Sequence, residues 1–335
     1  MSERAAPTFV SSTNNNFGMK AAIFERYGAP EVVQIKDVPQ PVPGDKDILI
    51  RIRATSVSSG DARIRRADPF AVRFVFGLFK PRRPILGYTF SGEVAATGAS
   101  VTKFKPGDEV FGSTDMRMGA HAEYLCLPEK GVVIPKPAQL SHEEAACLPF
   151  GAHTAWHFLQ LADVKPGQKI LIYGASGAVG SAAVQIARIL GAHVTGVCST
   201  ANLELVRSLG ADEVLDYTNP SQTPTPDHFD VVYETVNKTP LADCFSPLKK
   251  GGKLILGAAL LKGMIAGHFT GLLQGKKVLA GVALDDLPKL RRISEWATEG
   301  RLKVVIDKTY ALEEIAEAHR LVDSGRKRGN VAVRV

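Results

Sequence analysis

The sequence has few cysteines, and they lie far apart. The four are Cys126, Cys147, Cys198 and Cys244, and no two have the Cys-x-x-Cys spacing of a zinc or redox site. This pattern provides no disulfide framework of the kind that small secreted domains need. We therefore expect buried, hydrophobic cysteine side chains and a reducing compartment, for which the cytoplasm is the default.

Long apolar runs are also missing. The most apolar stretch outside a glycine-rich segment, Phe70 to Phe79, contains Arg73 and is shorter than a membrane span. Residues 1–18 are rich in Ser, Thr and Asn and lack the apolar core of a secretory signal. We expect these residues to form a disordered tail and the protein to have no membrane partner.

Basic residues outnumber acidic residues only modestly, 41 to 34, for a formal net charge of +7. They are scattered, apart from one group that we assign to a loop: Arg63, Arg65, Arg66, Arg73, Lys80, Arg82 and Arg83. A phosphate on a small ligand explains such an excess as well as DNA does. We therefore expect no nucleic-acid partner.

The hydrophobic pattern divides the chain, whose length fits two domains. Residues 19–140 contain short, alternating strands such as Ile48 to Ala54, separated by Pro and Gly turns, which predicts a partly closed β-barrel. Ser141 and Glu144 form a capping-box pattern, and strands and helices then alternate to residue 300. The segment 141–300 therefore predicts a doubly wound parallel sheet, a Rossmann domain. We expect residues 301–335 to return and complete the first domain.

The strongest motif is GASGAVG at residues 174–180, which follows a β-branched strand and opens an Ala-rich helix. Gly174 permits the tight turn, Gly177 lets the backbone approach a pyrophosphate, and Gly180 lets the helix pack against the sheet. The helix N-terminus then offers free N–H groups to phosphates. We expect the cofactor to contact Gly174, Ser176, Gly177, Ala178 and Val179.

The end of the next strand bears on the choice of nicotinamide cofactor. An NAD site places an acid there to bind the ribose 2′-hydroxyl, but the first acid in this chain is Glu204. Ser199, Thr200 and Asn202 instead offer donors to a 2′-phosphate, which favours NADPH, and Tyr217 adds a hydroxyl after the following strand. Ordinary N-capping of the helix by Ser199 or Thr200 is the alternative, and both roles can hold together.

Further segments resemble the medium-chain dehydrogenase/reductase superfamily and, within it, the zinc-independent, quinone oxidoreductase-like branch. The resemblance covers nearly the whole chain from Met19. It rests on the glycine-rich turn and on MKA (19–21), GYTFSGEV (87–94), PGDEV (106–110), GAHAEY (119–124), LP (148–149), TA (154–155), KPG (165–167) and LGAD (209–212). It implies a GroES-like catalytic domain, a Rossmann domain, an active-site cleft between them and commonly a homodimer.

The resemblance also implies that no metal is bound. The zinc enzymes of this superfamily hold catalytic zinc with Cys, a His-Glu pair and often a second Cys. The corresponding positions look like Ser58, Tyr88-Thr89 and Phe150, which lack thiolate and imidazole ligands. Without a metal, hydride from NADPH needs an acceptor that is already electrophilic, namely an α,β-unsaturated carbonyl or a quinone.

Individual residue roles follow from the same resemblance. Tyr88 would bond the substrate carbonyl, or else pack on the nicotinamide or in the core, and Ser58 would contact the nicotinamide ribose. The remaining cofactor contacts expected are Thr154, Gly257, Ala258 and Asn330. His121, His153 and His157 lack the spacing of a catalytic triad, so we expect them to be structural.

Two alternatives remain open. One is an enoyl-thioester reductase acting on acyl-CoA or acyl-carrier substrates, for which the basic group from Arg63 to Arg83 would receive a phosphate. The other is a catalytically weak NADPH-binding sensor or structural protein.

Overall fold

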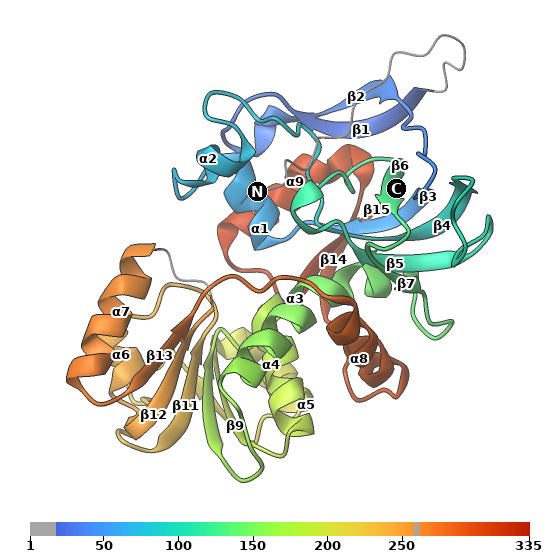
Figure 1. Cartoon of the computed structure of the whole chain (residues 1–335). Coiled ribbons are helices and arrows are strands. Elements are labelled where there is room, and N and C mark those ends of the chain that lie inside the picture. The colour runs from blue at the N-terminus through green and yellow to red at the C-terminus, as the bar shows by residue number, and fades with distance from the viewer. Residues whose placement is uncertain (1–17, 258–260) are drawn as a thin grey trace.

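The structure, a computed structural model, describes residues 18–257 and 261–335 and has two lobes (Figure 1). A sheet in the N-terminal lobe has the order β14-β15-β3-β4-β5-β7, and β6 pairs with β3. Its strands are β3 (Asp47–Ser56), β4 (Thr89–Thr97), β5 (Glu109–Ser113), β6 (Tyr124–Pro128), β7 (Val132–Pro135), β14 (Ile306–Ala311) and β15 (Asn330–Arg334). Because β15 pairs antiparallel with β3, the two C-terminal strands belong to the sheet of the N-terminal lobe.

Smaller elements surround this sheet. A hairpin is formed by β1 (Gly18–Phe24) and β2 (Val33–Pro39). The helices are α1 (Ser59–Arg66), α2 (Val72–Phe76) and α9 (Ile315–Ser324), with short 3-10 helices at Pro30–Val32, Asp115–Arg117 and Leu312–Glu314. α1 and α9 contribute Ile64, Ile315 and Val322 to one buried cluster with β15.

The second lobe is built on a six-stranded, wholly parallel sheet, as the sequence predicted. Its strands are β8 (Lys169–Tyr173), β9 (His193–Cys198), β10 (Glu213–Asp216), β11 (Phe229–Glu234), β12 (Leu248–Leu256) and β13 (Lys277–Ala280). The order β10-β9-β8-β11-β12-β13 reverses direction between β8 and β11, the switch point at which doubly wound sheets bind ligands.

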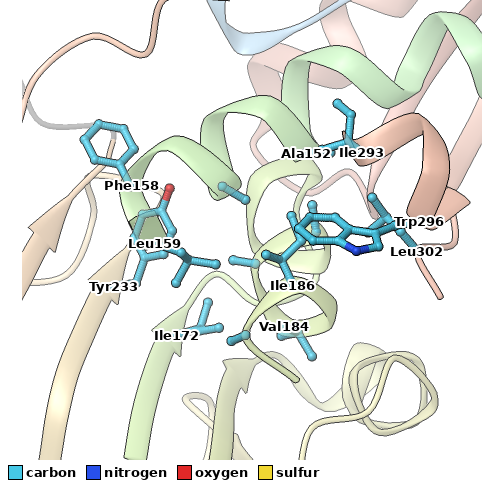
Figure 2. Close-up of a cluster of buried hydrophobic side chains, with 14 of the residues drawn as sticks. Ala152, Phe158, Leu159, Ile172, Val184, Ile186, Tyr233, Ile293, Trp296 and Leu302 are labelled. Atoms are coloured by element: carbon cyan, nitrogen blue, oxygen red, sulfur yellow. The ribbon is translucent and has the colours of Figure 1, made fainter. Parts of the chain in front are cut away.

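The remaining helices lie between residues 142 and 298. They are α3 (His142–Leu161), α4 (Ala178–Ile189), α5 (Leu203–Ser208), α6 (Leu241–Phe245), α7 (Leu261–Leu273) and α8 (Leu287–Thr298), with a 3-10 turn at Thr200–Asn202. Side chains of α3, α4 and α8 meet in the largest core, where Trp296 lies with Ile186 and Leu302 (Figure 2). The same core includes Phe111 of β5 and Ile172 of β8, so α3 packs against both sheets.

Several local expectations were wrong. Arg63 and its neighbours lie on α1 and Arg73 lies on α2, not in a loop. β6 begins only at Tyr124, and Gly119 before it has φ +111°. β13, α7 and α8 were not predicted. Within the part of the chain that the structure describes, no helix has the length and apolarity to cross a membrane.

Candidate cofactor and active site

The glycine-rich turn connects β8 to α4 at the switch point of the parallel sheet. Gly174 has φ +73°, a backbone conformation that side chains with a Cβ rarely adopt, and its N–H donates to the Val197 carbonyl at 3.1 Å. Gly177 is the N-cap of α4, with no side chain to satisfy the first-turn N–H groups. These groups face outward without helical acceptors, an arrangement that binds anions.

The structure gives two of the glycines different roles. A Cβ on Gly180 would lie 2.0 Å from the Gly174 carbonyl oxygen, so the fold itself requires glycine there. A Cβ on Gly177 would meet only that carbonyl, at the ordinary contact distance of 3.4 Å. Glycine at position 177 therefore leaves free space beside the helix N-terminus, and this space fits the close approach of a pyrophosphate.

Three predicted residues meet beside the turn. The Asn202 amide nitrogen donates to the Ser176 hydroxyl at 3.2 Å and to the Ser199 hydroxyl at 3.1 Å. Asn202 Oδ1 is buried and has no hydrogen-bond partner among the described residues. Turning the amide over would let both hydroxyls donate to Oδ1 and would leave the NH₂ free to donate to a ligand. This cluster joins the glycine turn to the end of β9.

Thr200 has a different environment from the one expected. Its hydroxyl donates to Asp216 Oδ2 at 2.5 Å and lies 2.9 Å from the Thr218 hydroxyl. Hydrogen bonds from Thr200 and Thr218 lower the pKa of Asp216, so its carboxylate is ionised at neutral pH. The sequence analysis missed this acid because it comes from the end of β10. Tyr217 follows it and is 68% exposed, free to contact a ligand.

Ser58 is the N-cap residue of α1, and its hydroxyl caps the helix. It donates to Asp61 Oδ2 at 2.5 Å and accepts from the Asp61 N–H at 3.2 Å, forming a capping box. Asp61 is fully buried, and its other oxygen accepts from the Gly87 N–H at 3.0 Å. Asp61 thus ties α1 to the residue that precedes Tyr88, while the Ser58 hydroxyl has no free proton for a ligand.

Some of the positions that correspond to zinc ligands in the zinc enzymes lie near one another. The rings of Tyr88 and Phe150 are in edge contact, with centroids 5.9 Å apart. A Cβ on Gly60 would lie 3.3 Å from Ser58 Oγ and 3.5 Å from the Phe150 ring, so these two side chains border the same space. Thr89 points into the core, where its hydroxyl lies 2.8 Å from Ser56 Oγ. Phe150 therefore lies near both the Tyr88 phenol and the Ser58 hydroxyl.

The Tyr88 hydroxyl lies beside Asp285 and Ser113. Burial raises the pKa of Tyr88 well above its usual value, and the negative charge of Asp285 raises it further. The phenol therefore keeps its proton at neutral pH and is a hydrogen-bond donor.

Asp285 also contacts His153 of α3. Its Oδ1 lies 2.9 Å from His153 Nδ1, and both side chains are almost completely buried. Asp285 Oδ2 has no hydrogen-bond partner in the described part of the chain. Neither residue was a candidate in the sequence analysis: Asp285 lies in an irregular segment before α8, and His153 has no triad-like spacing.

The remaining predicted cofactor residues contact other residues of the chain or lie outside the residues that the structure describes. The Thr154 hydroxyl donates to the Phe150 carbonyl at 2.8 Å. A Cβ on Gly257 would lie 2.6 Å from the Tyr233 ring, so that glycine is needed for packing at the end of β12. The Asn330 amide donates to the Val305 carbonyl at 3.0 Å. Ala258 lies outside the described residues.

A lysine that the sequence analysis overlooked lies next to the glycine turn. Lys327 Nζ donates to the Gly329 carbonyl at 2.5 Å, and the Gly329 N–H donates to the Ser176 carbonyl at 2.7 Å. Burial lowers the pKa of Lys327 to about 8. No local motif marks this residue, since the contact depends on the return of the C-terminal segment.

Comparisons with known proteins match both lobes. Residues 44–138 match the family described as alcohol dehydrogenase GroES-like domain, and residues 209–333 match the family described as zinc-binding dehydrogenase. A 2-methylene-furan-3-one reductase of Solanum lycopersicum is 31% identical over 99% of this chain and 83% of its own length. A chloroplastic quinone-oxidoreductase of Triphysaria versicolor is 32% identical over 94% of this chain and 98% of its own length.

A solved structure has the same architecture. The quinone oxidoreductase from Coxiella burnetii superposes with a TM-score of 0.84 at 27% identity, covering 95% of this chain and 99% of that one. Together with the glycine turn at the switch point, these matches imply a nicotinamide nucleotide cofactor and an oxidoreductase activity. The chain belongs to the medium-chain dehydrogenase/reductase superfamily, in its quinone oxidoreductase-like branch.

Proposed function

We propose that this protein reduces α,β-unsaturated carbonyl compounds or quinones with NADPH and without zinc. The observation that carries this proposal is the position of a protonated phenol, Tyr88, in edge contact with Phe150 and beside Asp285. Such a group donates a hydrogen bond but does not bind zinc as thiolate or imidazole does. Among the described residues, no three His, Cys, Asp or Glu side chains gather in a way that suits a metal ion.

The chain's own residues can hold a nicotinamide nucleotide. The first turn of α4, from Ala178, would donate N–H groups to the pyrophosphate, and the space at Gly177 would admit it. When bound, the nicotinamide supplies a hydride. Ser176, Ser199 and Asn202 would contact the adenosine ribose at the end of β9.

Tyr88 would orient and activate the acceptor. A conjugated carbonyl becomes negatively charged at oxygen as its β-carbon accepts hydride, and a quinone does the same at its own oxygen. A phenol that donates a hydrogen bond to this oxygen stabilises the charge and keeps its own proton, and water then protonates the reduced product. Because Asp285 and burial keep Tyr88 protonated, the donor is present throughout the neutral pH range.

The names of two relatives support this acceptor class. A 2-methylene-furan-3-one has an exocyclic double bond conjugated with a ketone, and the other relative is named for quinones. The enoyl-thioester alternative has less support. Arg65 is buried and bonds to Asp323 and the Gly28 carbonyl, and Arg66 also bonds to Asp323, so neither is available to a phosphate.

NADPH rather than NADH is the finer part of the proposal. Ser199 and Asn202 are uncharged and can donate to a 2′-phosphate. The negative charge of Asp216 would repel this phosphate, but both carboxylate oxygens already accept hydrogen bonds from Thr200 and Thr218. The preference therefore depends on how well these two threonines screen the carboxylate.

Titration of the purified protein with NADPH and NADH, followed by reduced-nicotinamide fluorescence, tests the cofactor. We expect tighter NADPH binding, then NADPH oxidation with simple enones and quinones. Tighter NADH binding would overturn the phosphate assignment alone. Binding without turnover over a broad panel would favour the sensor alternative, and failure of the folded protein to bind either nucleotide would overturn the whole proposal.

We further propose a homodimer in a reducing compartment, the cytoplasm. β13 is an edge strand of the parallel sheet, and the residues after it include the exposed Val282 and Leu284. A free edge beside exposed apolar side chains is a common pairing surface for a second copy. The four cysteines are free and three are buried, which fits a reducing environment. Light scattering on the purified protein tests the dimer, and a monomer would overturn it.

A further inference from the structure

The apolar stretch around α2 has no function in the reductase proposal. Five of its large hydrophobic side chains are exposed to solvent: Phe70, Phe74, Val75, Leu78 and Phe79, with exposed fractions from 41% to 88%. α2 lies at the outer edge of the N-terminal lobe, away from the two large sheets (Figure 1). Single exposed hydrophobic residues are ordinary, but a run of five within ten residues is not.

The stretch is held rigidly in this exposed position. Phe76 is buried in the cluster that also contains Ile64 and Phe24. The Tyr27 hydroxyl donates to the Gly77 carbonyl at 2.6 Å, and the Arg73 guanidinium lies 4.6 Å above the Tyr27 ring. These contacts anchor one side of the segment, so its other side presents the exposed apolar residues on a fixed base.

Basic residues border the apolar side chains. Residues 69–92 contain no Asp or Glu. Lys80 and Arg82 are exposed, and neither has an acidic partner within ion-pairing distance among the described residues. The acids that flank this segment in the sequence are Asp68, which interacts with Arg63, and Glu93, which bonds to Arg53. The surface therefore combines aromatic side chains with uncompensated positive charge.

We propose that this surface docks on an anionic lipid bilayer. We define the α2 surface as Phe70, Phe74, Val75, Leu78, Phe79, Lys80 and Arg82. Aromatic rings and aliphatic side chains enter the headgroup boundary to a depth of about 5–10 Å, while lysine and arginine contact lipid phosphates. The charge selects an anionic bilayer over a neutral one. The earlier expectation of no membrane partner rested on the lack of a spanning segment, which does not bear on surface docking.

Vesicle cosedimentation of the full-length protein tests this proposal without reference to catalysis. We expect binding to vesicles of phosphatidylserine mixed with phosphatidylcholine, weaker binding to phosphatidylcholine alone, and loss of binding as salt is raised. The double substitution Phe74→Ser with Phe79→Ser should weaken binding at least about tenfold, because two exposed rings no longer enter the lipid. Lys80→Glu with Arg82→Glu should also weaken it more than about tenfold, since each cation contributes about fivefold.

Matched variants separate local docking from general stickiness. Lys105→Glu with Lys130→Glu changes the net charge by the same amount at two other exposed lysines, and Phe269→Ser removes an exposed ring from α7. Both should bind vesicles like the wild type. The proposal is overturned if the folded wild type does not bind anionic vesicles, if the charge control weakens binding as much as Lys80→Glu with Arg82→Glu, or if the phenylalanine variant alters only the oligomeric state.

Discussion

The imidazole of His153 and the carboxylate of Asp285 are joined across 2.9 Å in the interior, where α3 meets the segment before α8. His153 Nε2 accepts from the Asp286 N–H at 3.0 Å, so Nδ1 carries the proton and faces Asp285 Oδ1. Asp285 in turn lies beside the Tyr88 hydroxyl. The pair thus connects the Rossmann lobe to the proposed hydrogen-bond donor of the other lobe.

Removing the Tyr88 hydroxyl tests its proposed role. We expect Tyr88→Phe to lower kcat/KM for an enone about 100-fold, as loss of one donor to a developing oxyanion does, without changing the Kd of the cofactor. Phe150→Leu, which alters the same ring contact but removes no donor, is the control. Equal activity of Tyr88→Phe and the wild type would assign Tyr88 to packing.

Asp285 should also matter for stability. Asp285→Ala removes the buried carboxylate that lies 2.9 Å from His153 Nδ1, and we expect it to lower the free energy of unfolding by about 1–3 kcal/mol. Asp285→Asn keeps a polar oxygen near this nitrogen, so it should lose less. Urea unfolding of both variants measures the difference. If the two variants lose the same stability, the polar contact with His153 does not contribute.

The two glycines of the turn provide a matched pair. Gly180→Ala forces a methyl group to within 2.0 Å of the Gly174 carbonyl, and we expect at least about 2 kcal/mol of destabilisation from overpacking. Gly177→Ala has room for its methyl group in the free protein, so it should unfold like the wild type. It should nevertheless weaken cofactor binding more than about tenfold, because the methyl fills the space of the pyrophosphate. Unchanged nucleotide affinity in Gly177→Ala would place the pyrophosphate elsewhere.

Local signals in the sequence were sufficient for much of the fold. The alternation of strands and helices predicted the parallel sheet, and the Ser141 and Glu144 pattern predicted the start of α3. The glycine motif was expected between a strand and a helix, where the structure has it. These features depend on neighbours a few residues apart, so the sequence alone could predict them.

The parts that were missed depend on distant neighbours. Asp216 reaches Thr200 because β10 lies beside β9, and Asp285 reaches His153 because α8 packs near α3. A local signal could have predicted α1, which we took for a loop. Ser58 and Asp61 form a capping box with Asp in place of Glu. The many arginines after it concealed a helix that buries Ala62 and Ile64.

The carboxylate of Asp216 should decide how strongly NADPH is preferred. Asp216→Asn removes a negative charge next to Thr200 and keeps one acceptor oxygen, which can receive one of the two threonine hydroxyls. We expect NADPH to bind severalfold more tightly and NADH to bind no better, since only NADPH has a phosphate to be repelled. Fluorescence titration of both nucleotides measures this ratio. An unchanged ratio would mean that the 2′-phosphate lies away from the end of β10.

The pH dependence of cofactor binding should depend on Lys327. Its pKa is lowered to about 8, so the ammonium loses its proton in a range where other lysines stay charged. A cation beside the glycine turn attracts phosphates, and we therefore expect NADPH affinity to be constant between about pH 7 and 8, where the 2′-phosphate is fully ionised, and to fall above pH 8, by no more than about tenfold per pH unit. Lys327→Met should bind weakly at every pH, whereas Lys250→Met, at an exposed lysine, should follow the wild type. A flat wild-type profile from neutral to alkaline pH would show that Lys327 stays too far from the phosphates to act on them.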